Sequence, residues 1–169
     1  METDPHPGFK LFDNARAYSK AATLMNAKAA AKCNAVFTHV SQSSAIYAAL
    51  AIDYYLKTLY YLQHKKEYRD YGKTPHDFSS IYNELKHKTK KDLENRFAAR
   101  IAMQGRETAP LPQDLKTTLK HWTDAFARLR VQPGRFNGNS LYFFQEMEEV
   151  FKTQILNEHP EWGYRSGKG

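Results

Sequence analysis

The sequence predicts an all-α fold, an up-and-down helical bundle of about five to six helices. Apolar side chains recur at three- and four-residue spacing in six separate segments, which is the pattern of amphipathic helices. No segment alternates apolar and polar residues for long enough to form a strand, and proline, glycine and asparagine mark the connections. A chain of 169 residues with 41% hydrophobic content can bury one core.

Start and stop signals give each helix its expected range. Asp13 or Asn14 can cap the first helix, whose alanine-rich middle favours close approach of a neighbouring helix. Serines within 41–44 can cap the second helix, which ends near His64. Thr74 is the expected cap of the third helix. The expected ranges of the third, fourth, fifth and sixth helices are 74–85, 89–105, 115–129 and 140–159.

These helices form one expected domain over residues 13–160. Residues 1–12 contain prolines and a glycine and are expected to be an irregular arm, whereas the basic residues 161–169 are expected to be a flexible tail. The N-terminus has no secretory signal pattern, and the longest near-apolar run is interrupted by Asp53 and Lys57. We therefore expect a cytoplasmic protein without a membrane partner.

The composition favours an anionic partner. The formal net charge is +7 and the isoelectric point is near 9.4, which suits nucleic acid, nucleotides or acidic proteins. A basic surface that serves only solubility is the alternative. The single cysteine, Cys33, excludes an internal disulfide framework and fits a reducing compartment.

An acid and a base lie four residues apart on the otherwise apolar second helix. Asp53 and Lys57 are one helical turn apart, so an ion pair between them is expected. A buried pair needs further hydrogen-bond partners, for which Arg128 or Arg130 of the fifth helix is a candidate. We interpret Asp53 and Lys57 as a structural polar clamp between helices, with a ligand site as the alternative.

The common catalytic and metal-binding motifs are not found. The seven histidines do not share the three- or four-residue spacing that places two metal ligands on one helix face. There is no glycine-rich phosphate loop and no nucleophile elbow. The spacing of Glu146, Glu148 and Glu149 is interpreted as that of surface carboxylates. The sequence therefore predicts no metal site, no cofactor and no catalytic residue.

Two basic stretches indicate contact with phosphate. Lysines and arginines dominate residues 86–106, and Lys65, Lys66 and Arg69 are interleaved with Tyr68. Cations neutralise phosphates and aromatic rings stack on bases, so such mixtures suit single-stranded RNA or nucleotides. A solvated basic face with inward tyrosines is the alternative.

The order of these features resembles the HEPN (higher eukaryotes and prokaryotes nucleotide-binding) family. The motif residues are Ala51-Ile-Asp-Tyr-Tyr-Leu-Lys57 on the second helix, His76-Asp-Phe78 at the start of the third, and Arg128-Leu-Arg130 on the fifth. The resemblance implies a small α-helical bundle that binds nucleotides or RNA and commonly forms a homodimer.

Nuclease members of that family carry an arginine, four to six spacer residues and a histidine near a helix start. No histidine follows Arg128, Arg130 or Arg135 at that distance. We therefore expect a non-catalytic domain that binds RNA, a nucleotide or a protein partner. The expected ligand-binding residues are Lys57, His76, Arg128, Arg130 and Arg135. Two alternatives remain open: a metal-independent ribonuclease with an atypical active site, and a toxin–antitoxin-like or dimerising interaction module.

Overall fold

The computed structural model describes residues 6–30, 36–69, 76–103, 114–131 and 141–164. These ranges contain no strand, and the predicted all-α bundle is confirmed. The elements are α1 (Pro7–Ala30), α2 (Val36–His64), α3 (Phe78–Asn83), α4 (His87–Met103), α5 (Leu115–Val131), α6 (Leu141–Glu158) and the short 3-10 helix η2 (Pro160–Gly163).

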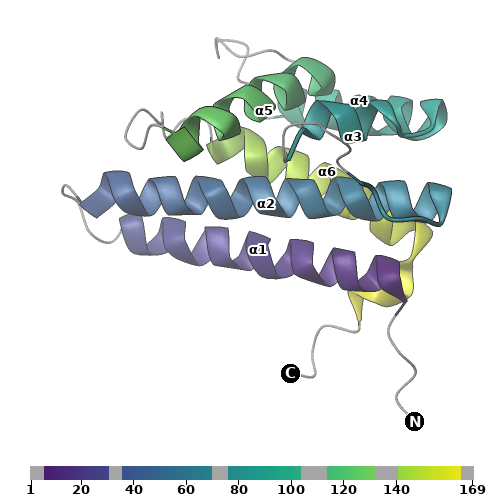
Figure 1. Ribbon diagram of the computed structural model, residues 1–169, viewed down its shortest axis with the longest axis horizontal. Helices are drawn as coiled ribbons and strands as arrows, with labels where there is room; N and C mark the ends of the chain where they lie inside the picture. Colours follow the sequence, from purple (N-terminus) through teal and green to yellow (C-terminus); the bar gives the residue numbers. More distant parts are fainter. Residues whose placement is uncertain (1–5, 31–35, 70–75, 104–113, 132–140, 165–169) are drawn as a thin grey trace.

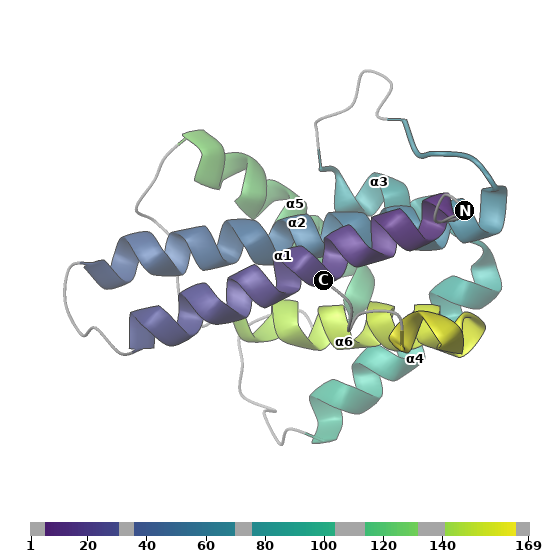
Figure 2. The same cartoon turned by 90° about the horizontal axis from the view of Figure 1, so that it is seen from below.

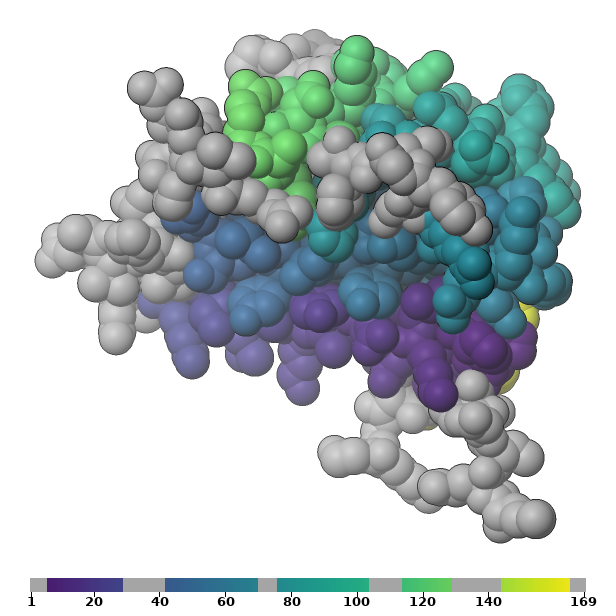
Figure 3. Space-filling view, viewed as in Figure 1, coloured from purple at the N-terminus to yellow at the C-terminus, as the bar shows by residue number. Residues whose placement is uncertain are grey.

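The helices form three layers, with α2 and α6 in the middle. Helix α1 runs antiparallel to α2 and covers one side of this layer, while α3, α4 and α5 cover the other (Figures 1 and 2). In the space-filling view α1 and α2 form the lower part of the visible face, and α5 lies above them (Figure 3). Opposite sides of α2 therefore face different neighbours.

Helix α2 is buried on several sides because it contacts α1, α3, α5 and α6. A helix that is apolar around much of its circumference is expected in such a central position. Ile52, Leu56 and Leu59 are fully buried, and Tyr55 is only 1% exposed. None of the helices in the described part of the chain is both long enough and apolar enough to cross a bilayer.

Both ends of the domain differ from the predicted boundaries. Helix α1 begins at Pro7, six residues before the expected cap Asp13, and Phe12 is fully buried. Trp162, which falls in the predicted tail, is 3% exposed and packs against Phe12 with 5.7 Å between ring centroids. The aromatic side chains extend the core at both ends, since burying a large ring is strongly favourable.

Helix α2 also begins earlier than its serines suggest, at Val36. Ser44 lies inside the helix, is 2% exposed, and donates a 2.8 Å hydrogen bond to the Ala22 carbonyl of α1. The serine hydroxyl thus joins two closely packed helices instead of capping one. The predicted cap of the third helix, Thr74, lies outside the described residues.

Asp77 caps α3. Its Oδ1 accepts a 3.0 Å hydrogen bond from the Ser80 backbone N–H, and its Oδ2 accepts a 2.6 Å bond from the Ser80 hydroxyl. A side-chain oxygen at this position satisfies a helix N–H that has no partner within the helix.

Replacing Asp77 by alanine should lower the free energy of unfolding by about 1 kcal/mol, because the cap is lost. The urea midpoint of the variant measures this change. Asp77→Asn retains a capping oxygen and should stay close to the parent protein. An equal loss in both variants would show that the capping bond is not the stabilising contact.

Candidate functional site

A buried carboxylate that is shared by a lysine and a histidine forms the candidate site. Lys57 Nζ lies 2.7 Å from Asp53 Oδ2, so the expected ion pair is present. His76 Nδ1 lies 3.3 Å from the same oxygen. The Asp53 side chain is 1% exposed, whereas those of Lys57 and His76 are 19% and 27% exposed. The negative charge is therefore buried, and both basic groups reach solvent.

Three helices position these side chains. Asp53 and Lys57 are one turn apart on α2, and His76 immediately precedes the capping residue Asp77 of α3. The His76 ring meets the edge of Phe126 from α5 at a centroid distance of 5.3 Å. His76 also has a positive φ of 65°, a left-handed conformation that is uncommon outside glycine, asparagine, aspartate and histidine. Such backbone conformations are concentrated at functional sites.

One oxygen at this site has no hydrogen-bond partner among the described residues. Asp53 Oδ1 is buried and unpaired, and the contact between Asp53 Oδ2 and His76 Nδ1 lies outside hydrogen-bonding geometry. This contact is electrostatic when the imidazole is protonated. A buried carboxylate oxygen without a partner is costly, and the attraction of Asp53 to Lys57 and His76 opposes this cost.

His76, and not the candidate Arg128, is the second basic neighbour of Asp53 among the described side chains. Arg128 is exposed, and its Nε donates a 3.2 Å hydrogen bond to the Asp124 carbonyl of its own helix. Arg130 belongs to α5, but its side chain lies outside the described residues, as does the whole of Arg135. Among the predicted ligand-binding residues, the structure thus brings Lys57 and His76 together and leaves Arg128 apart from their shared carboxylate.

No histidine follows the arginines of the fifth helix at the nuclease spacing. The pattern occurs earlier, because Arg69 and His76 are separated by six residues. His76 also stands two residues before α3 begins, near a helix start as the pattern requires. Arg69 is exposed, and the spacer residues 70–75 lie outside the described part of the chain. The chain therefore contains one Arg-x(4–6)-His sequence, although the arginines of the fifth helix are not part of it.

The basic stretch on α4 is partly engaged within the protein. Lys90 Nζ donates a 3.0 Å hydrogen bond to the Asn83 carbonyl, and Arg100 pairs with Glu146 of α6. Glu146 is 5% exposed, contrary to its interpretation as a surface carboxylate. Glu146 is buried because α6 lies in the middle layer and has neighbours on both sides, whereas Glu149 of the same helix is partly exposed.

Glu148 is the second buried α6 carboxylate. It is 8% exposed, its Oε2 accepts a 2.7 Å hydrogen bond from the Ser19 hydroxyl of α1, and its Oε1 has no hydrogen-bond partner among the described residues. Burial raises the pKa of the Glu148 carboxyl to about 7, and the bond from Ser19 only partly opposes this effect. The surface interpretation of Glu148 is also corrected.

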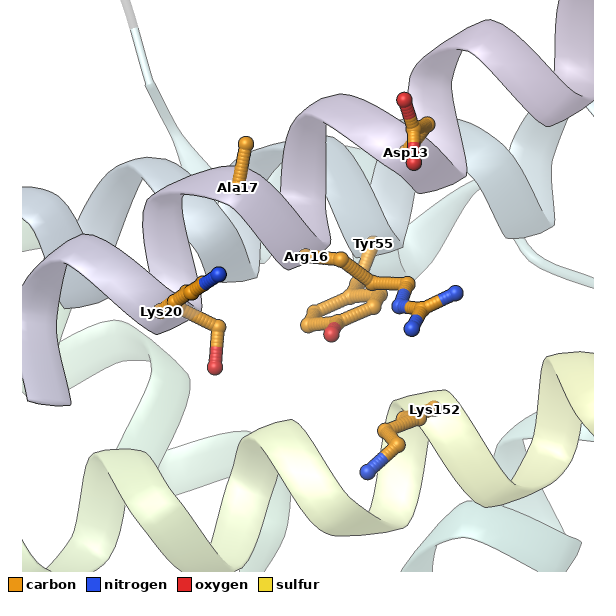
Figure 4. A pocket seen from close by; sticks show the side chains of 7 residues that line it. Asp13, Arg16, Ala17, Lys20, Tyr55 and Lys152 are labelled. Carbon is orange, nitrogen blue, oxygen red and sulfur yellow. The ribbon is translucent and has the colours of Figure 1, made fainter. Parts of the chain in front are cut away.

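A pocket of about 390 Å³ lies between α1 and α6, on the side of α2 that faces away from His76. Figure 4 shows the Tyr55 hydroxyl directed into it, with Arg16 and Lys20 from α1 and Lys152 from α6 around it. No pattern in the sequence predicted this pocket. The four-residue spacing of Arg16 and Lys20 places both on one face of a helix. Lys152 is distant in sequence, so its position beside them could not be predicted.

Within the described ranges, no three histidine, cysteine, aspartate or glutamate side chains are placed so that they could hold a metal ion. Comparison of the chain with protein-family models, with curated proteins and with solved structures gives no match. The resemblance to the HEPN family therefore rests on the short motifs alone, and the site must be interpreted from its own geometry.

Proposed function

We propose that this protein is a helical domain that binds an anionic ligand, RNA or a nucleotide, at the site of Asp53, Lys57 and His76. The observation that carries the proposal is the pairing of two partly exposed basic groups with one buried carboxylate. When the imidazole is protonated, this group has two positive charges and one negative charge. The carboxylate holds the lysine and histidine in place, and their exposed edges can donate to a phosphate.

The surrounding charge supports the same ligand class. Lys65, Lys66 and Arg69 are exposed where the chain leaves α2, and the whole chain carries a net charge of +7. Clustered cations attract the sugar–phosphate backbone independently of base sequence. Tyr68 is half-buried and contacts Tyr60 edge-on, with 5.1 Å between the ring centroids. Its ring therefore packs within the protein, and only its exposed part is available for stacking on a base.

A metal-independent ribonuclease is the second candidate, and a specific observation favours it. Asp53 faces Nδ1 of His76, which leaves Nε2 as the ring nitrogen for proton exchange with a ribose hydroxyl. Lys57 can neutralise charge on the phosphate during attack by the 2′-oxygen. The six-residue spacing between Arg69 and His76 adds to this candidate.

Binding should be tested with a labelled single-stranded RNA by fluorescence anisotropy across a range of salt concentrations. Lys57→Gln should weaken binding and reduce the slope of log K against log salt by about 0.7, the value for one lost contact to a single strand. Lys28→Gln is the matched control, because Lys28 is exposed near the end of α1, on the opposite side of α2 from α3 and α5. Equal losses in both variants would contradict a defined site.

Cleavage of the same RNA separates the two candidates. His76→Asn keeps a residue type that tolerates positive φ and removes the imidazole. If the protein is a ribonuclease, cleavage should persist in EDTA and fall at least about 100-fold in this variant, the usual contribution of a general acid or base. Binding without any cleavage by the parent protein would leave the non-catalytic proposal in place.

A further inference from the structure

The pocket between α1 and α6 is separate from the site of Asp53. Tyr55 and Asp53 are two residues apart on α2, and residues at that spacing do not share a helix face. The Tyr55 side chain therefore lies on the α1 and α6 side, whereas Asp53 faces His76, which precedes α3. A ligand in this pocket would be bound independently of the proposed RNA site.

The charges of the pocket favour an anion. Its lining side chains include three cations, Arg16, Lys20 and Lys152, and one carboxylate, Asp13. The Asp13 carboxylate lies at one end of the pocket, away from the Tyr55 hydroxyl (Figure 4). The lining thus has an excess of two positive charges, which matches the charge of −1.5 to −2 on a phosphate monoester near neutral pH.

Two further carboxylates stand next to the lining. Glu149 Oε1 lies 3.2 Å from Lys152 Nζ, and both side chains are more than one-third exposed. Such a pair contributes little to stability, so a ligand phosphate can compete with Glu149 for Lys152. Glu148 lies behind Ser19, which donates to it. Its pKa is raised to about 7 by burial, so it is partly neutral at that pH and repels an anion less than an ordinary glutamate.

The pocket also offers hydrogen-bond donors that are held in place. Arg16 Nη1 is buried and has no hydrogen-bond partner among the described residues, while the guanidinium lies 5.7 Å from the Phe12 ring centroid. Tyr55 is 1% exposed. Burial, together with the nearby Glu148 charge, raises the pKa of the Tyr55 hydroxyl, so this group stays protonated and able to donate.

We propose that this pocket binds a small organic phosphate, with Arg16, Lys20 and Lys152 contacting the phosphate oxygens and the Tyr55 hydroxyl donating a hydrogen bond. The pocket volume of about 390 Å³ lies in the range of small-molecule sites. A guanidinium can contact two phosphate oxygens at once, and the lysines act as point charges beside it.

Titration calorimetry with phenyl phosphate tests this proposal. The dissociation constant should rise about tenfold in Tyr55→Phe, which removes one donor to a charged group, and by a similar factor in Lys20→Gln. Lys88→Gln changes the net charge equally on a distant part of α4 and should bind within about twofold of the parent protein. Thermal melts of each variant check that the fold is retained.

Inorganic phosphate is the second probe and should bind more weakly than phenyl phosphate, because it leaves much of the pocket unfilled. Absence of saturable binding, or an equal loss of affinity in Lys88→Gln and Lys20→Gln, would overturn the proposal. Equal affinity for the two probes would overturn the assignment to an organic phosphate. RNA binding should be unchanged in Tyr55→Phe, so failure here is distinguishable from failure of the proposed RNA site.

Discussion

Replacing Glu148 by glutamine is expected to stabilise the folded protein at alkaline pH by up to about 3 kcal/mol. Burial raises the pKa of this carboxyl from 4.5 to about 7. Between these values the folded state binds more protons than the unfolded state, so the free energy of unfolding falls as the pH rises from about 4.5 to 7. A neutral glutamine avoids this cost at every pH.

Urea unfolding between pH 4.5 and 8.5 measures the effect. The parent protein should lose stability as the pH rises, whereas Glu148→Gln should have a flatter profile over the same range. Near pH 4.5 the variant should be equal to the parent or slightly less stable, because the glutamine oxygen can still accept from Ser19 but its amide nitrogen lies where Oε1 has no partner.

The matched control is Glu67→Gln, which changes the charge equally at an exposed position. Its pH profile should follow that of the parent protein. If the two glutamine variants have the same profile, the destabilisation at alkaline pH arises from the total charge and not from the buried position of Glu148.

Replacing Asp53 by alanine is expected to lower the free energy of unfolding by about 2–3 kcal/mol. The carboxylate is 1% exposed and is the 2.7 Å partner of Lys57 and the 3.3 Å neighbour of His76. Removing it leaves both basic groups without their shared acceptor in a largely buried setting. The loss of one partner of a fully buried pair costs about 3–5 kcal/mol, and the partial exposure of Lys57 and His76 reduces that figure.

The Asp53→Asn variant separates the contribution of the negative charge to stability from the contribution of the side-chain shape. It fills the same space and retains one acceptor oxygen, so it should recover part of the stability that alanine loses. Asp124→Ala on the exposed surface of α5 controls for the loss of one negative charge and should change stability by less than about 0.5 kcal/mol. An unchanged melting temperature in Asp53→Ala would contradict the interpretation of Asp53 and Lys57 as a structural clamp.

The local parts of this structure could be predicted from the sequence. Leu115, Leu119, Trp122 and Phe126 have the spacing of one apolar helix face, and all four side chains are buried in α5. The pairing of Asp53 and Lys57 was predictable for the same reason, since residues four apart on a helix are neighbours. The short-range geometry of the helix determines both results.

Contacts between distant segments could not be predicted in this way. His76 was expected within the third helix, but it precedes the cap of α3 with a positive φ and approaches Asp53. Glu146 and Glu148 were interpreted as exposed, like the partly exposed Glu149, because one helix alone gives no information about its neighbours. Their burial arises from contacts with Ser19 of α1 and Arg100 of α4.

The sequence by itself therefore determined the helical class, the positions of most helices and the ion pair within α2, because each of these depends on residues within a few turns of one another. Only the tertiary structure decided which groups surround the Asp53 carboxylate, that Glu148 is buried, and that Arg16, Lys20 and Lys152 line one pocket with Tyr55. These features depend on how separate helices pack, and packing brings together residues more than one hundred positions apart.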